Sequence, residues 1–115
     1  YLDGEFYSLF LRNANYQFQN PLDALNNQIL YKTILDPILG ISDVRNNTRL
    51  SYSYGKNNMV TIKTEVDSGE FALGFGLVPI TIHELKAIAD EGLTMPPKST
   101  FIEPKLRSAV TIYEF

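Results

Sequence analysis

The stretch FALGFGLV, Phe71–Val78, decides the predicted fold because almost every residue in it is apolar. A short apolar run without polar alternation is typical of a central strand that is buried on both faces. Gly74 and Gly76 interrupt the run at two positions that have no side chain. They favour tight packing of a helix against the strand, and the alternative is the close approach of a ligand or another backbone.

Helices are predicted on both sides of this strand. Residues Thr81–Glu84 form a capping box, and Gly92 is a typical residue after the last helical turn. Another helix begins at Asn20-Pro21, a favourable cap followed by a proline in the first turn, and ends at Asp36-Pro37. Residues 59–66 fit both a strand and a helical apolar stripe, and intrinsic propensity favours the strand.

Three further strands complete the expected sheet. Asp3-Gly4 predicts a tight hairpin turn between Tyr1-Leu2 and residues 5–11. Residues 50–54 and 108–115 alternate between apolar and polar side chains, as half-buried strands do. Tyr1-Leu2 is short for a strand, so we expect the sequence to be a fragment of a longer protein.

Four runs of sequence resemble one protein family: LDPILGI (35–41), VDSGEFALGF (66–75), IADEG (88–92) and MPPKSTFIEPKL (95–106). They resemble the C-terminal part of an uncharacterised conserved bacterial and archaeal family, catalogued as domain of unknown function number one thousand and fifteen. The resemblance implies a helix at 59–67. It also implies a longer chain, in which residues 1–115 are a single C-terminal domain and the missing N-terminal part is a partner. Some members loosely resemble partition proteins or free-serine kinases, but no reaction is agreed, so the resemblance assigns no catalytic residue.

With residues 59–67 as a helix, the predicted fold class is α+β. We expect a mixed sheet of about four strands with about three packed helices, in the order β-α-β-α-β-α-loop-β. Ten apolar residues are expected to be buried together: Leu25, Ile29, Phe71, Leu73, Phe75, Leu77, Leu85, Ile88, Val110 and Ile112.

The composition is that of one folded globular domain. The chain has 115 residues, of which 44% are hydrophobic, and it has no cysteine. Cysteine-free chains fit the reducing cytoplasm, and no apolar run approaches the ~20 residues that span a bilayer. The net charge of −3 disfavours nucleic acid as the main partner, although the likeness to partition proteins keeps that class as a weaker alternative.

The best candidate site is the proline-rich loop, residues 95–106, which holds three of the six prolines. Proline fixes φ and removes a backbone donor, so this segment is a stiff loop with polar groups at set positions. Lys98, Ser99, Thr100 and Lys105 are candidates for binding a phosphate or carboxylate, because an ammonium supplies charge and hydroxyls supply directed donors. The alternative is that the lysines are solvated and that the two hydroxyl groups cap a turn.

Other chemistry has weaker support in the sequence. His83 is the only histidine and falls in the first turn of a capped helix, where an exposed position is favoured over a catalytic base. One histidine and no cysteine predict no metal site. Whether the protein uses a cofactor is unknown from the sequence. We therefore expect a small-anion binding domain, within a metabolic enzyme, or a structural module that packs against the missing N-terminal part.

Overall fold

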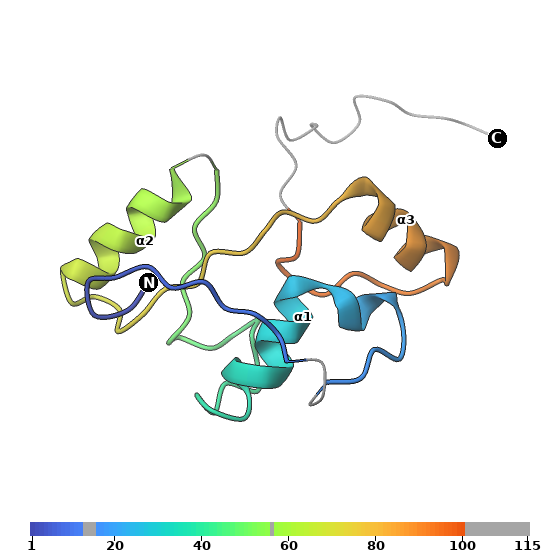
Figure 1. The fold of residues 1–115 in the computed structure, drawn as a ribbon, viewed down its shortest axis with the longest axis horizontal. Helices are drawn as coiled ribbons and strands as arrows, with labels where there is room; N and C mark the ends of the chain where they lie inside the picture. Colours follow the sequence, from blue (N-terminus) through green and yellow to red (C-terminus); the bar gives the residue numbers. More distant parts are fainter. Residues whose placement is uncertain (13–15, 56, 101–115) are drawn as a thin grey trace.

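The computed structural model describes residues 1–12, 16–55 and 57–100. Its elements are η2 (a 3-10 helix, Pro21–Ala24), α1 (Asn26–Leu30), η3 (a π-helix, Tyr31–Leu35), α2 (Asn58–Asp67) and α3 (Ile82–Asp90). Figure 1 shows α2 and α3 toward opposite ends of the molecule, with α1 between them, and residues 71–81 running from α2 to α3. α3 packs against η2, and α1 is continuous with η3.

The predicted mixed sheet is wrong. Within the described ranges there is no β-strand, only two isolated antiparallel bridges that join Leu2 to Glu5 and Leu2 to Leu73. Residues 5–11, 50–54 and 71–78 form no strand, and residues 108–115 lie outside the described part. An apolar or alternating pattern shows only that a segment can bury a face, whereas a strand also needs a neighbour for its backbone hydrogen bonds. Of the predicted order β-α-β-α-β-α-loop-β, the described residues therefore form helical segments but none of the strands.

Two of the predicted helices are confirmed. Thr81 Oγ1 accepts from the Glu84 backbone N–H at 3.2 Å, and the Glu84 carboxylate accepts from Thr81, which completes the capping box of α3. Both α2 and α3 end in a glycine at positive φ, Gly69 at 79° and Gly92 at 66°. After each glycine the next N–H donates to the carbonyl five residues earlier, Glu70 to Glu65 and Leu93 to Ile88, as in the Schellman motif.

The helix predicted between Pro21 and Asp36 begins where expected but is not continuous. The Asn20 side chain accepts from the Leu22 and Asp23 N–H groups, so Asn20-Pro21 does start a helical segment. Leu25 then adopts extended dihedral angles (φ −69°, ψ 134°) and separates η2 from α1. Its side chain is completely buried. Burial of this side chain accompanies a break that no proline or glycine marks in the sequence.

The segment Phe71–Val78 packs against a helix instead of a strand. A Cβ added at Gly74 would lie 2.1 Å from Ile62 Cγ2, and one added at Gly76 would lie 2.6 Å from Met59 Sδ. Both neighbours belong to α2, so the absence of side chains lets α2 approach this backbone closely. The helix-packing interpretation of the two glycines is confirmed.

The N-terminal segment is tied to the same part of the molecule. Asp3 and Gly4 have φ values of 49° and 83°, and two Leu2–Glu5 backbone hydrogen bonds close the predicted turn. The terminal ammonium of Tyr1 donates to Gly74 O at 2.7 Å, and the Gly74 N–H donates to Tyr1 O at 2.9 Å. The Tyr1 hydroxyl donates to Asp67 Oδ1 at the end of α2. Residues 1–5 therefore bind both α2 and the segment that follows it.

The core is smaller than predicted. Of the predicted core residues, Leu25 and Ile88 are buried, whereas Leu77 is 44% and Leu85 37% exposed, so those two predictions are wrong. Ile29, Phe71, Leu73 and Phe75 are half-buried, and Val110 and Ile112 lie outside the described residues. Without a sheet there is no second layer to cover Leu77, and many of these side chains face a cavity.

Candidate functional site

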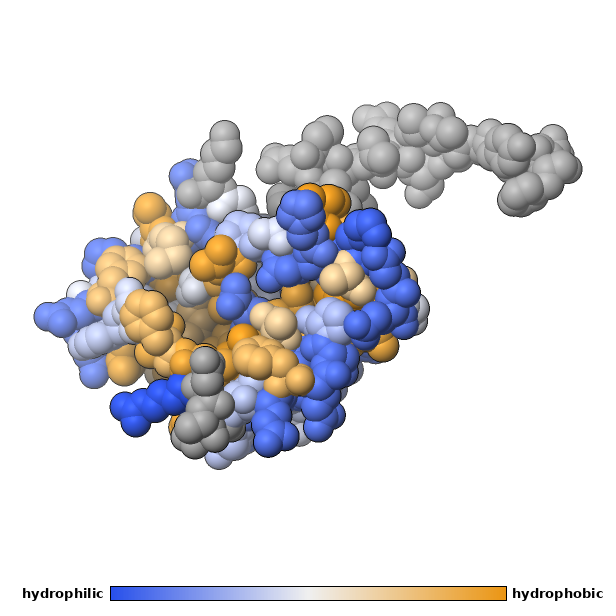
Figure 2. Space-filling view, turned by 45° about the vertical axis from the view of Figure 1, so that its right-hand side comes forward, coloured by the Kyte–Doolittle hydropathy of each residue, from blue (hydrophilic) through white to orange (hydrophobic). Residues whose placement is uncertain are grey.

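A cavity of about 1510 Å³ lies in the described part of the chain. Its walls are α1, η3, the loop that follows them, one side of α2, residues 70–82 and the loop at Pro96–Thr100. Figure 2 shows apolar side chains gathered around a recess on one face of the molecule. Such a hollow exceeds the ~300–1,000 Å³ of most small-molecule sites, so it has room for a ligand of substantial size.

The proline-rich loop forms one edge of this cavity. Pro96, Pro97, Lys98, Ser99 and Thr100 all line it, so the structure brings three of the four predicted site residues to one hollow. The fourth, Lys105, lies outside the described residues.

Side-chain hydrogen bonds hold the shape of the loop. Ser99 Oγ donates to Pro96 O at 2.5 Å and accepts from Asn27 Nδ2 at 2.7 Å. The first bond closes the loop on itself, and the second joins it to α1 across 72 positions of sequence. In this arrangement the single Ser99 hydroxyl proton is used within the loop.

Lys98 is held in an unusual backbone conformation at the cavity edge. Its φ is 59°, and among the described residues other than glycine only Asp3 shares a positive φ. A left-handed conformation costs a residue with a Cβ about 1–2 kcal/mol. The Lys98 ammonium lies 5.8 Å from the centre of the Tyr52 ring, within the range of a cation–π contact.

Tyr52 is fixed where it meets Lys98. Its hydroxyl donates to Val44 O at 2.7 Å, which joins the two ends of the 44–52 loop. Burial raises the pKa of Tyr52, so its hydroxyl stays protonated and keeps this bond across the neutral range. The ring is therefore a neutral, fixed wall beside the Lys98 cation.

Charged side chains are divided between the walls of the cavity. Arg45 and Arg49 lie in the same 44–52 loop as Tyr52, whereas Glu65 lies on α2 and Glu70 just after it. The Arg49 guanidinium donates to Leu39 O at 2.8 Å, which fixes it against the end of the preceding helical segment. The loop next to the proline-rich loop therefore carries two arginines and the Asp43 carboxylate, whereas the α2 wall carries carboxylates only.

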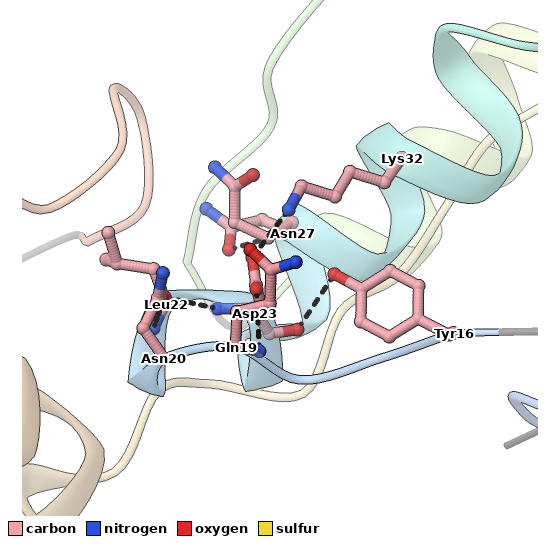
Figure 3. A network of polar contacts seen from close by, with 8 residues as sticks. Tyr16, Gln19, Asn20, Leu22, Asp23, Asn27 and Lys32 are labelled. Atoms are coloured by element: carbon pink, nitrogen blue, oxygen red, sulfur yellow. Dashed lines mark hydrogen bonds and ion pairs between the residues drawn. The ribbon is translucent and has the colours of Figure 1, made fainter.

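A second polar cluster, which the sequence analysis missed, surrounds Asp23. Figure 3 shows Lys32 and Gln19 converging on the Asp23 carboxylate, and Tyr16 bonded to the Asp23 backbone. Lys32 Nζ lies 2.5 Å from Oδ1, and the Gln19 N–H donates to Oδ2 at 3.0 Å. The Tyr16 hydroxyl donates to Asp23 O, also at 3.0 Å.

The electrostatics of this cluster indicate a structural role. The hydrogen bond from Lys32 and the one from the Gln19 N–H lower the pKa of Asp23, and the same contact raises the pKa of Lys32. The Asp23 side chain is only 6% exposed, and both of its carboxylate oxygens accept hydrogen bonds from protein donors. It has no free face for a substrate, and it anchors residues 16–20 to η2 and η3.

The remaining candidates do not form a reactive site. His83 is exposed in the first turn of α3, which confirms the exposed position that the sequence favoured. In the described part of the chain no group of three or more histidine, cysteine or acidic residues is placed to hold a metal ion. None of the described helices is both long enough and apolar enough to cross a membrane.

Comparisons with protein family models, with curated proteins and with solved structures found no match. The resemblance to an uncharacterised family therefore stays a prediction from the sequence.

Proposed function

We propose that this domain binds a small anionic molecule, phosphorylated or carboxylated, in the cavity beside the proline-rich loop. The observation that carries the proposal is the position of Lys98, a cation that lines this cavity. Lys98 is exposed, so a dissolved anion can reach its ammonium, and the apolar lining on the cavity side lowers the local dielectric and strengthens the attraction.

The backbone of Lys98 supports the proposal independently. Strained left-handed residues that are not glycine persist where the surroundings hold them, and they are concentrated at ligand sites. Here Ser99 supplies that hold through Pro96 and Asn27 on its two sides. Within the proposal, Ser99 shapes the loop, while Lys98 and Thr100 meet the anion, with Arg49 from the neighbouring 44–52 loop adding to the field.

A titration with inorganic phosphate and with acetate tests the proposal. Unfolding of the wild type and of Lys98→Met is followed by heat or urea as each anion is added at constant ionic strength. A ligand at ~100 times its Kd stabilises the folded state by about 2.7 kcal/mol, so even weak binding is measurable. We expect stabilisation of the wild type and little or none of Lys98→Met.

Lys86→Met is the matched control for the loss of one positive charge. Lys86 forms an ion pair with Asp90 on the exposed side of α3 and does not line the cavity. It should respond to the anions as the wild type does. Equal responses from all three proteins would contradict the proposal.

A second candidate function is a structural module that associates with another part of the protein or with a partner. An apolar patch favours it: Phe6, Tyr7, Met59, Leu77 and Val78 surround one shallow hollow, and each side chain is at least 40% exposed. Contiguous exposed apolar surface of this kind marks interaction sites in folded proteins. Tyr7→Asn, in this patch but not in the lining of the cavity, should then weaken self-association, measured by analytical ultracentrifugation, without changing the response to anions.

A further inference from the structure

The lining of the cavity indicates more about the ligand than its charge. Most of the surface that lines it is apolar and includes side chains such as Phe71, Leu73, Phe75 and Leu77, which the sequence placed in a sheet core. These side chains are half-buried or exposed because they border the hollow. An inorganic anion at Lys98 would leave this apolar surface in contact with water.

We propose that the ligand is a free amphiphilic anion with one charged head, such as a medium-chain or aryl-substituted carboxylate or phosphate monoester. This inference rests on the proposed function, because it places the head at Lys98. The apolar body then lies along the wall formed by Leu73 and Leu77. Covering that wall releases water from apolar surface at about 25 cal/mol per Å², which favours a long body over a short one.

The distribution of charge limits the ligand to one head. Lys98 lies on the proline-rich loop, and Arg45 and Arg49 outnumber the Asp43 carboxylate on the loop beside it, whereas Glu65 on α2 and Glu70 just after α2 have no lining cation on their own segment. A second carboxylate at the far end of the ligand would approach these acidic side chains and lose water without gaining a partner. A monocarboxylate should therefore bind better than a dicarboxylate of the same length.

Calorimetric titration with butyrate, decanoate, decanedioate and decanol tests the inference, each below the concentration at which it forms micelles. A fully buried methylene contributes ~0.8 kcal/mol, about fourfold in affinity, so decanoate should bind at least tenfold more tightly than butyrate even with partial burial. Decanoate should also bind at least fivefold more tightly than decanedioate. Lys98→Met should lose at least fivefold in decanoate affinity and nothing in decanol affinity, and Lys86→Met should match the wild type.

A wall variant separates the body from the head. Leu77→Gln removes apolar surface from the cavity at a side chain that is already 44% exposed, so folding is retained. It should weaken decanoate severalfold and leave butyrate unchanged. Val60→Gln, on the face of α2 that does not line the cavity, is its control.

The possible outcomes distinguish the two proposals. Equal affinities for butyrate and decanoate, both abolished in Lys98→Met, would overturn the amphiphile and leave anion binding intact. Equal affinities for decanol and decanoate in the wild type and Lys98→Met would overturn both. Retention on anionic phospholipid vesicles without any binding of decanoate in solution would overturn the free ligand in favour of a membrane surface.

Discussion

The packing of α2 on Phe71–Val78 predicts that Gly74→Ala destabilises the fold. The added Cβ would lie 2.1 Å from Ile62 Cγ2 and 3.4 Å from Ile62 Cβ. Isoleucine in a helix has one strongly preferred χ1 rotamer, so Cγ2 cannot turn away. The contact is relieved only if α2 shifts from the segment.

The magnitude follows from two opposing effects. Forcing an extra methyl group into a packed contact costs about 1–3 kcal/mol. Gly74 is not among the glycines at positive φ, so alanine fits its backbone and gains about 0.4–1 kcal/mol by restricting the unfolded chain. With the middle of each range, the difference is a net destabilisation of about 1.3 kcal/mol.

Gly76→Ala is the matched control, because its new Cβ would meet the flexible end of Met59 instead. The nearest atoms are Met59 Sδ at 2.6 Å and Cε at 3.2 Å. Methionine has three rotatable bonds and can move its thioether aside, so this variant should stay within about 1 kcal/mol of the wild type.

Urea unfolding followed by far-ultraviolet circular dichroism measures the difference. With an m value of ~1.5–2 kcal/mol/M, the Gly74→Ala midpoint should fall by roughly 0.3–1 M. In a protein that already carries Ile62→Ala, Gly74→Ala should lower the urea midpoint by less, because the two substitutions share one contact. A Gly74→Ala midpoint equal to or above that of Gly76→Ala would refute the close packing of α2 on this segment.

Three further predictions concern the loop and the buried carboxylate. Lys98→Asn should keep or raise the urea midpoint, because asparagine tolerates positive φ better than lysine, and the response to anions should be lost. A loss of more than ~1 kcal/mol in the free energy of unfolding would show that Lys98 is not strained. Asn27→Ala removes the hydrogen bond to Ser99 and leaves Lys98 in place, so a titration should show anion binding weakened severalfold. Urea unfolding of the same variant should show a loss of ~0.5–1.5 kcal/mol of stability. Because Lys32 lowers the pKa of Asp23 in the folded state, the stability from this pair is complete above pH ~4 and lost as pH falls below it; the acid limb of a pH–stability curve should flatten in Asp23→Asn, and an unchanged limb would contradict the pairing.

Local signals in the sequence predicted the ends of helices well. The capping box at Thr81 and the glycine after α3 depend on backbone groups within a few residues, so their chemistry is readable from the sequence. The Asp3-Gly4 turn is equally local. The helix at α2 was ambiguous by pattern, and only the family resemblance favoured it.

Non-local features could not be read from the same patterns. Phe71–Val78 has the composition of a buried strand, but whether it pairs depends on segments elsewhere in the chain, and here α2 takes the position of a neighbouring strand. The break at Leu25 accompanies the burial of one side chain and has no breaker residue to mark it. The proline-rich loop was predicted as a site from its composition. Its link to Asn27 and its contact with Tyr52 required the fold.

Amide chemical-shift mapping with decanoate tests the central claim most directly. A ¹⁵N-labelled protein is titrated with decanoate, and the affected amides are assigned along the chain. Binding at the proposed site predicts the largest shifts at Lys98, Ser99 and Thr100, at Tyr52 and in the Asn27 side-chain amide, all saturating with one Kd. Shifts confined to residues outside the cavity, or none at 98–100 at saturating decanoate, would contradict the proposal that this loop binds the charged head.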